Sequence, residues 1–310
     1  MALSTRITEM LGIEKPIIQA AMGWIARAQL SSAVSNAGGM GIIETSSGEL
    51  DAVREEILKM RQLTDKPFGV NVAQAFVRDP DIIRFVIDQG VKFVTTSAGD
   101  PMKYTAMLKE AGLTVFHVVP NLAGALRAVE AGVDGLIVEG GEGGGFKNPK
   151  DVSTMVLVPQ VVEAVDVPVV AAGGIMDGKT MAAAFALGAE GVLMGTRILS
   201  SAESPVHQNW KQAILDADAT DTVFLNRKGP GPALRALRTG RSTRIAAEGS
   251  PNIFGEFADT RKVYFEGDLE AGIALTGQVA GRIHEVKPVA QILDETMREY
   301  AAVVAGMPRG

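Results

Sequence analysis

Short runs of apolar, often β-branched residues recur along the first two-thirds of the chain, and Gly or Pro closes each run. Each run has the length and composition of a buried strand. Segments with a helical pattern, rich in Ala, Leu, Glu and Lys, lie between them, as in residues 28–39 and 121–132. The eight predicted strands are residues 16–22, 39–44, 67–73, 92–98, 114–120, 135–140, 168–174 and 191–196.

Strict alternation of strands and helices predicts an α/β fold with a parallel sheet. An open doubly wound sheet uses the same units, but eight of them favour a closed barrel. The predicted fold class is therefore a (β/α)8 TIM barrel with an outer ring of helices.

The pattern changes after the eighth strand. Residues 200–285 contain helical pieces and no convincing strand, and residues 288–306 form an apolar helical pattern that is expected to return to the barrel wall. We therefore expect a barrel of residues 1–220 plus 285–310 and an inserted small helical domain of residues 221–284. An insertion at the end of a strand lies on the active-site face of a barrel, so a lid or substrate wall is its expected role.

Composition narrows the function classes. Hydrophobic residues make up 46% of the 310 residues, which is enough for a large core. The apolar runs are far shorter than the roughly 20 residues that a membrane helix needs, and the start of the chain lacks a targeting pattern, so we expect a cytoplasmic protein. The net charge of -6 argues against a general nucleic-acid or anionic-membrane surface. The absence of Cys excludes disulfides, thiolate metal sites and a Cys nucleophile, and we expect no metal site.

The loops after the seventh and eighth strands have the composition of a phosphate site. Gly173 and Gly174 let an anion approach the main chain, and the helix that begins near Gly178 could point its N-terminus at that anion. Gly195 and Thr196 would supply further N–H groups and a hydroxyl. The alternative is that these glycines only fit tight turns, but two such loops at the expected strand ends favour a bound phosphate.

The other strand ends are poor in catalytic side chains. Ala20, Ala21 and Met22 stand at the end of the first strand and Asn71 stands near the end of the third, and no acid pair, HExxH or Ser-His-Asp set is present. A phosphate site beside such residues fits a planar organic cofactor that brings its own reactivity, and this indicates a flavin.

Seven motifs in matching order, between about Thr5 and Gly281, resemble one family. They are QAAMGW, KPFGVNV, EGGEGGG, VPVVAAGGIMDG, MGTR, SPVH and TGQVAG. The chain resembles the nitronate monooxygenase or 2-nitropropane dioxygenase-like FMN oxidoreductases, which include the enoyl-acyl-carrier-protein reductase II type and an NADH:quinone reductase branch.

The resemblance implies FMN at the barrel mouth and an inserted helical substrate domain. It places the FMN-binding residues at Ala20, Ala21, Met22, Asn71, Glu139, Gly144, Gly173, Gly174, Gly195, Thr196 and Gln278. Of these, Ala21, Met22 and Asn71 would lie by the isoalloxazine. Glu139 would lie near the ribityl chain or ring, and Gln278 near the flavin edge. The glycines after the sixth strand, including Gly144, would let the chain pass along the flavin.

The sequence departs from the family at the end of the glycine-rich turn. Phe146 stands where the family usually has a catalytic His, and a longer turn, Lys147-Asn148-Pro149, follows. A phenyl ring cannot take a proton from a neutral nitroalkane, whereas preformed nitronates and hydride or electron transfer through FMN need no such base.

Lys147 and His117 are the candidates for a replacement group. The alternative for Lys147 is an ordinary solvated loop lysine, which we slightly favour. Val118 occupies the position of a flavin-contacting Lys in a relative, so strand alternation would turn His117 away from the barrel lumen. A structural His117 is the favoured interpretation.

A basic run between residues 224 and 244 contains six cations and no acid. We expect Arg235 and Arg238 to lie on one face of a helix, where they could bind a phosphate-bearing substrate such as NAD(P)H, a CoA thioester or a carrier-protein arm. The alternative is a solvated helix face neutralised by nearby acids.

The favoured function is an FMN-dependent oxidoreductase that acts on an activated C=C, acyl thioester or quinone-like substrate, with NAD(P)H as a candidate co-substrate. The second hypothesis is nitronate oxidation with O2, and the third is a non-catalytic flavin-binding partner subunit. The sequence leaves monomer and homodimer open.

Overall fold

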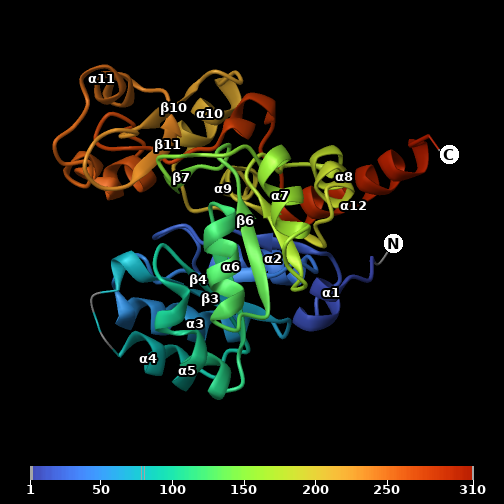
Figure 1. Cartoon of the computed structure of the whole chain (residues 1–310). Helices are drawn as coiled ribbons and strands as arrows, with labels where there is room; N and C mark the ends of the chain where they lie inside the picture. Colours follow the sequence, from blue (N-terminus) through green and yellow to red (C-terminus); the bar gives the residue numbers. More distant parts are fainter. Residues whose placement is uncertain (1–2, 78, 80, 309–310) are drawn as a thin grey trace.

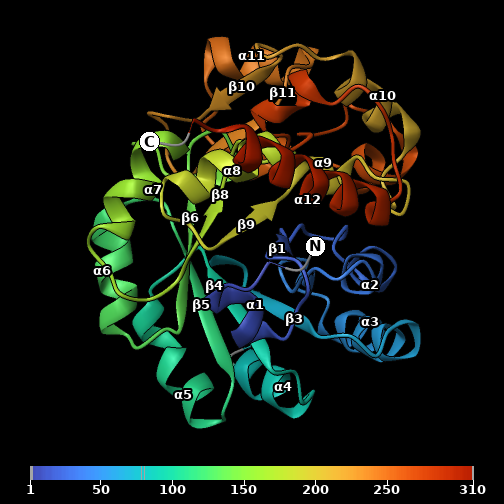
Figure 2. The same ribbon diagram turned by 90° about the vertical axis from the view of Figure 1, so that its right-hand side faces the viewer.

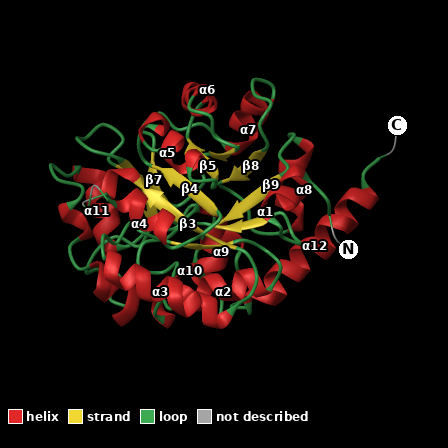
Figure 3. Ribbon diagram, turned by 90° about the horizontal axis from the view of Figure 1, so that it is seen from below, coloured by secondary structure: helices red, strands yellow, loops and turns green. Residues whose placement is uncertain are grey.

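The computed structural model describes residues 3–77, 79 and 81–308. Its central feature is a ring of eight parallel strands in the order β1-β9-β8-β6-β5-β4-β3-β2, and a parallel bridge between Ile18 and Met40 links the two end strands. The strands are β1 (Ile17–Gln19), β2 (Gly41–Ile43), β3 (Phe68–Ala73), β4 (Phe93–Ser97), β5 (Thr114–Val119), β6 (Gly135–Glu139), β8 (Val169–Ala172) and β9 (Gly191–Met194). All eight predicted strands are confirmed, and they form a nearly closed, TIM-like barrel (Figure 3).

Helices surround the barrel, and one precedes its first strand (Figure 2). The helices are α1 (Arg6–Leu11), α2 (Ala28–Asn36), α3 (Leu50–Leu63), α4 (Ile82–Asp88), α5 (Thr105–Glu110), α6 (Leu122–Glu130), α7 (Thr154–Val162) and α8 (Gly178–Ala186). Strand residues alternate between two cores because successive side chains point to opposite faces. Phe93 and Phe116 fill the barrel interior with Ile7 and Leu11 of α1, whereas Val94 and Val115 belong to the larger cluster with the helices.

The C-terminal helix α12 (Val289–Gly306) returns to the barrel and packs against α8 and α2. The contact between the two helices is close at Gly178, where a Cβ atom would clash with the backbone of Thr296, Glu299 and Tyr300. This contact agrees with the expectation that residues 288–306 return to the barrel wall.

The chain between β9 and α12, here called the post-β9 segment (residues 195–288), lies beyond the carboxyl ends of the barrel strands (Figure 1). Its elements are α9 (Thr196–Leu199), α10 (Gln208–Asp216), β10 (Thr222–Leu225), β11 (Ala233–Leu237), α11 (Gly240–Glu248), η3 (Gly255–Phe257), η4 (Lys262–Glu266) and η5 (Gln278–Arg282). A short strand from the barrel loop after β6, β7 (Gly145–Lys147), completes an antiparallel sheet in the order β10-β11-β7.

The prediction that this segment is entirely helical is therefore wrong. Residues 233–237, expected in a helix, form a strand that is buried along its whole length and is paired on both sides. Ala, Leu and Arg favour a helix locally, but tertiary pairing overrides that weak preference. Residues 269–283 carry one of the helical patterns expected within residues 200–285, but only Gln278–Arg282 forms a short 3-10 turn there.

Among the described residues, no helix combines the length and the apolar composition that crossing a bilayer requires.

Candidate functional site

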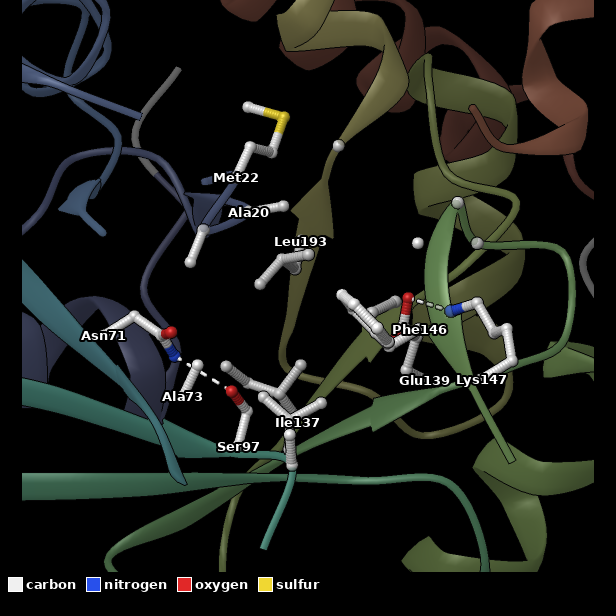
Figure 4. A pocket seen from close by; sticks show the side chains of 18 of the residues that line it. Ala20, Met22, Asn71, Ala73, Ser97, Ile137, Glu139, Phe146, Lys147 and Leu193 are labelled. Carbon is white, nitrogen blue, oxygen red and sulfur yellow. Dashed lines mark hydrogen bonds and ion pairs between the residues drawn. The ribbon is translucent and has the colours of Figure 1, made fainter. Parts of the chain in front are cut away.

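A cavity of about 850 Å³ opens at the carboxyl ends of the barrel strands (Figure 4). Residues of the post-β9 segment, among them Trp210, Phe254 and Tyr264, also line it. Its volume lies within the usual range for small-molecule sites, about 300 to 1,000 Å³. The predicted cofactor-binding residues that line it are Ala20, Ala21, Met22, Asn71, Glu139, Gly144, Gly173, Gly174, Gly195 and Thr196. Gln278 is not among the described lining residues, although its neighbours Gly277 and Val279 are.

The two glycine loops meet at one side of this cavity. Gly173 and Gly174 have φ values of +87° and +77°, a left-handed conformation that favours glycine. The N–H groups of Gly174 and Thr196 make no hydrogen bond with any residue the structure describes. The Thr196 hydroxyl accepts a hydrogen bond from the Gly277 N–H at 2.8 Å, which ties the post-β9 segment to this loop.

The N-terminus of α8 does not face an open anion site. The Gly178 N–H donates to Glu299 Oε2 of α12 at 2.8 Å, and the Thr180 N–H donates to the capping Asp177 carboxylate at 2.9 Å. Two carboxylates of the chain itself therefore occupy the position that was predicted for a bound anion. The prediction that the N-terminus of α8 points at a bound phosphate is therefore wrong. The sequence alone does not show that Glu299, from the distant helix α12, packs against this end of α8.

Two buried amide side chains reach the cavity from the strand ring, Gln19 from the end of β1 and Asn71 from β3. Asn71 is buried, and its Nδ2 donates to Thr95 Oγ1 at 2.9 Å and to Ser97 Oγ at 3.4 Å (Figure 4). Gln19 is fully buried and lines the cavity, and its Oε1 has no hydrogen-bond partner among the described residues. Because a buried, unpaired carbonyl is costly, Gln19 Oε1 is suited to a donor group on a ligand.

Lys147 forms an ion pair with Glu139, the last residue of β6 (Figure 4). The Lys147 side chain is only 4% exposed and lines the cavity, so the expectation of a solvated loop lysine is wrong. A Cβ atom on Gly143 would lie 2.7 Å from Lys147 Nζ. Glycine at this position therefore allows the loop to close over the ion pair.

Phe146 also lines the cavity, but it belongs to a group of aromatic rings. Its ring centroid lies 4.9 Å from that of Phe76, 5.7 Å from that of Phe257 and 6.3 Å from that of Phe254. These four residues are called the phenylalanine wall below. Phe254 is 51% exposed, so the wall reaches from the cavity to the surface.

Tyr264 is a cavity residue that the sequence prediction missed. It lies on η4, a π-helical turn, and its ring packs against Trp210 at 4.8 Å and Trp24 at 6.4 Å. The Tyr264 side chain is buried at the cavity wall. Burial, assisted by the nearby Glu44 carboxylate, raises the pKa of the Tyr264 phenol, so the hydroxyl remains a donor. π-Helical turns are rare in proteins, and those that occur are often found at functional sites. The sequence carries no signal that would have predicted this one.

His117 is buried, and its Nδ1 lies 2.7 Å from Thr96 Oγ1 on the neighbouring strand. Its neighbours Phe116 and Val118 pack in the barrel interior, which agrees with an imidazole turned away from the lumen. The ring reaches the cavity wall at its edge, where burial lowers the pKa of His117 to about 4. A neutral imidazole that connects two strands fits the structural interpretation.

The basic run is largely neutralised by the chain itself. Arg235 is buried on strand β11, where Nε donates to the Gly141 carbonyl oxygen at 2.6 Å, and Arg238 pairs with Asp221 at 3.9 Å. Neither arginine is among the described residues that line the cavity. The prediction that the two share one face of a helix is wrong, because Arg235 lies on a strand. Arg227 pairs with Asp151, and Arg241 and Arg244 pair with Glu256.

Comparisons with known proteins agree with this architecture. The family model described as nitronate monooxygenase matches residues 4–82 and 73–299. A (3aS,4S,5R,7aS)-5-hydroxy-7a-methyl-1-oxo-octahydro-1H-indene-4-carboxyl-CoA dehydrogenase of Mycobacterium tuberculosis is 41% identical over 242 residues, which are 77% of this chain and 67% of that protein. A probable nitronate monooxygenase of Staphylococcus saprophyticus is 35% identical over 271 residues, covering 73% of this chain and 76% of that protein.

Among solved structures, FabK from Thermotoga maritima superimposes with a TM-score of 0.91 at 42% identity, covering 98% of both chains. The family match extends over nearly the whole chain, in agreement with the resemblance of the seven motifs. The family's members are enzymes, so the hypothesis of a non-catalytic subunit is set aside. The chain belongs to the nitronate monooxygenase family and is an oxidoreductase.

Proposed function

We propose that this oxidoreductase uses FMN and acts on an acyl thioester, by hydride transfer to or from a carbon of the acyl group. The observation that carries the proposal is Phe146, which supplies an apolar ring at the cavity in the position where the family usually has a histidine. A site without that base is poorly suited to neutral nitroalkanes and well suited to chemistry in which hydride moves. The relatives named for a carboxyl-CoA substrate and as FabK, an enoyl-acyl-carrier-protein reductase, support a thioester.

The residues present fit FMN. The unpaired N–H groups of Gly174 and Thr196, beside Gly195, suit a phosphate. The unpaired Gln19 Oε1 suits an N–H donor at a ring edge, with Asn71 in the same part of the cavity. When bound, FMN supplies a ring nitrogen that accepts and gives hydride. The protein's tasks are then to hold the ring, exclude water and orient the acyl group.

The phenylalanine wall provides the surface for that acyl group. Phe76, Phe146 and Phe254 line the cavity and present apolar rings between its floor and the surface. An aliphatic or alicyclic acyl group would bury its surface there, while the polar carrier arm remains near the exposed end at Phe254. In this proposal the post-β9 segment acts as the substrate lid, and the basic run is not the anchor for the carrier.

The test is anaerobic spectroscopy of the purified protein with its flavin. Bleaching of the visible flavin band by NADH or NADPH, followed by recovery on adding crotonyl-CoA, would establish a thioester reductase. Bleaching by butyryl-CoA alone would establish the dehydrogenase direction.

Two results would overturn the proposal. If the flavin ignores nicotinamides and acyl-CoA but is bleached by ethyl nitronate, the enzyme is a nitronate monooxygenase. If the protein binds no flavin even after FMN is added, the cofactor assignment fails.

A further inference from the structure

We infer that Lys147, oriented by Glu139, binds the thioester carbonyl oxygen of the substrate and stabilises the negative charge that develops there. The inference rests on the proposed function for the substrate class. It assigns to this lysine a task that the missing histidine leaves open.

The first argument is the unused hydrogen-bonding capacity of the ammonium group. A lysine ammonium has three N–H donors, and the Glu139 carboxylate is the partner of Lys147 within the described residues. The side chain is 4% exposed and borders the cavity, so bulk water does not surround the remaining donors. A buried cation with spare donors at a cavity wall is suited to an acceptor oxygen on a ligand.

The second argument is direction. Phe146 and Lys147 are consecutive residues of β7, so their side chains leave opposite faces of the sheet. Phe146 packs with the apolar cluster of the post-β9 segment, opposite Leu234 in the register. Lys147 consequently faces the barrel, where the end of β6 presents Glu139 (Figure 4).

The third argument is rigidity. Pairing of Lys147 with Ala233 fixes the lysine backbone, and Gly143 closes over the ion pair. A cation held in place before the reaction stabilises developing charge more effectively than one that must reorganise.

The chemistry requires such a group. When hydride that originates from a reduced nicotinamide is added to the β-carbon of an enoyl thioester, the electron pair of the double bond moves toward the carbonyl. The carbonyl oxygen then carries the negative charge of an enolate, until a proton from solvent joins the α-carbon and the C=O bond re-forms. The reverse reaction, dehydrogenation of the acyl thioester, passes through the same enolate. An ammonium beside this oxygen stabilises the enolate in both directions.

The test uses acetoacetyl-CoA, whose dicarbonyl group ionises to an enolate that absorbs in the ultraviolet. Binding to the FMN-loaded protein is measured by calorimetry, and the bound enolate by its absorption, so neither readout needs turnover. We expect the native protein to bind the probe as its enolate. Lys147→Met should keep its flavin, lose the enolate absorption and bind the probe about 10- to 100-fold more weakly, the loss expected for a hydrogen bond to a charged group.

Two variants serve as controls. Lys147→Arg keeps the charge and should retain part of the enolate absorption. Lys150→Met removes an exposed lysine three residues further along and should match the native protein. If Lys147→Met does not fold, the apparent pKa of acetoacetyl-CoA on the native protein replaces it. A pKa well below that of the free thioester supports the inference, and an unchanged one overturns it.

The outcomes separate the two proposals. If Lys147→Met binds the enolate as the native protein does, Lys147 only cross-links β7 and β6, and the inference alone fails. It also fails alone if the native protein binds butyryl-CoA but takes acetoacetyl-CoA in its neutral form. If the native protein binds none of butyryl-, crotonyl- and acetoacetyl-CoA, the proposed function fails and the inference fails with it.

Discussion

The guanidinium Nε of Arg235 donates a 2.6 Å hydrogen bond to the carbonyl oxygen of Gly141 and so joins strand β11 to the glycine-rich loop after β6. This contact connects the post-β9 segment to the loop that presents Phe146 and Lys147 to the cavity. Arg235 therefore acts inside the protein, although its position in a basic run suggested a substrate ligand.

Arg235→Met should destabilise the fold by about 2 to 3 kcal/mol, because it removes a charged donor from a buried carbonyl. The exposed Arg238→Met is the matched control and should stay within about 0.5 kcal/mol of the native protein. Urea unfolding measures both changes. A substrate-binding role would instead appear as a raised KM in both variants without a stability difference between them.

Gly195→Leu should abolish retention of FMN while the apoprotein stays folded. The residue has a φ of -100°, so a side chain brings no left-handed strain, and a Cβ atom there would approach Ala20 Cβ at an ordinary 3.5 Å. The side chain would then fill the space assigned to the phosphate. The flavin-to-protein absorbance ratio after purification measures retention, and Gly306→Leu, at an open surface position, is the control. A Gly195→Leu protein with full flavin would refute the phosphate assignment.

Phe146→His should raise activity on neutral nitroalkanes by more than about tenfold, because a positioned general base contributes at least that much. Nitrite release from nitroethane measures the gain. Phe257→His is the control, since this ring stacks on Phe146 but is not among the described residues that line the cavity. Equal activity of both variants and the native protein would show that residue 146 lies outside the reacting part of the site.

Tyr264→Phe should lower kcat/KM for the thioester substrate about 3- to 10-fold, the effect of one hydrogen bond from a neutral donor. Flavin content should not change. Because burial raises the pKa of this phenol, the ratio of native to variant activity should stay constant from neutral pH to about pH 10. Tyr300→Phe, on α12 against Phe185, is the control. A Tyr264→Phe enzyme with native kcat/KM would show that the hydroxyl contacts no substrate.

His117 should make the fold sensitive to acid. Its pKa is about 4 in the folded protein against an ordinary 6.5, so below pH 6.5 the unfolded chain takes up a proton that the folded protein does not. The free energy of unfolding therefore falls as the pH drops from 6.5 to 4, by about 3 kcal/mol from this residue. Above pH 6.5 the residue contributes no pH dependence. Unfolding curves of the native protein and His117→Gln across this range should diverge in slope, and parallel slopes would contradict the assignment.

The barrel could be predicted because each strand is a short apolar run with its own Gly or Pro boundary, so local sequence carries the signal. Strand β11 could not, because Ala-Leu-Arg-Ala-Leu becomes a strand only through pairing with β7, nearly ninety residues earlier. Tertiary contacts outweigh propensity there.

The candidate site also has some features that the sequence could predict and others that it could not. The glycines and small residues at strand ends were predictable, because the fold brings such ends together. The direction of Lys147 was not, since it follows from the pairing of β7 that turns Phe146 to one face and the lysine to the other. Tyr264 depends on a π-helical turn that has no sequence signature.

Strand β7 belongs to a barrel loop by covalent connection and to the sheet of β10 and β11 by hydrogen bonding. The post-β9 segment consequently cannot swing open as an independent rigid body without breaking the backbone bonds between β7 and β11. We expect the amide protons of these two strands to exchange with solvent together, as one cooperative unit. We therefore expect substrates to enter without a hinge motion of this segment, past side chains at the cavity rim such as the half-exposed Phe254.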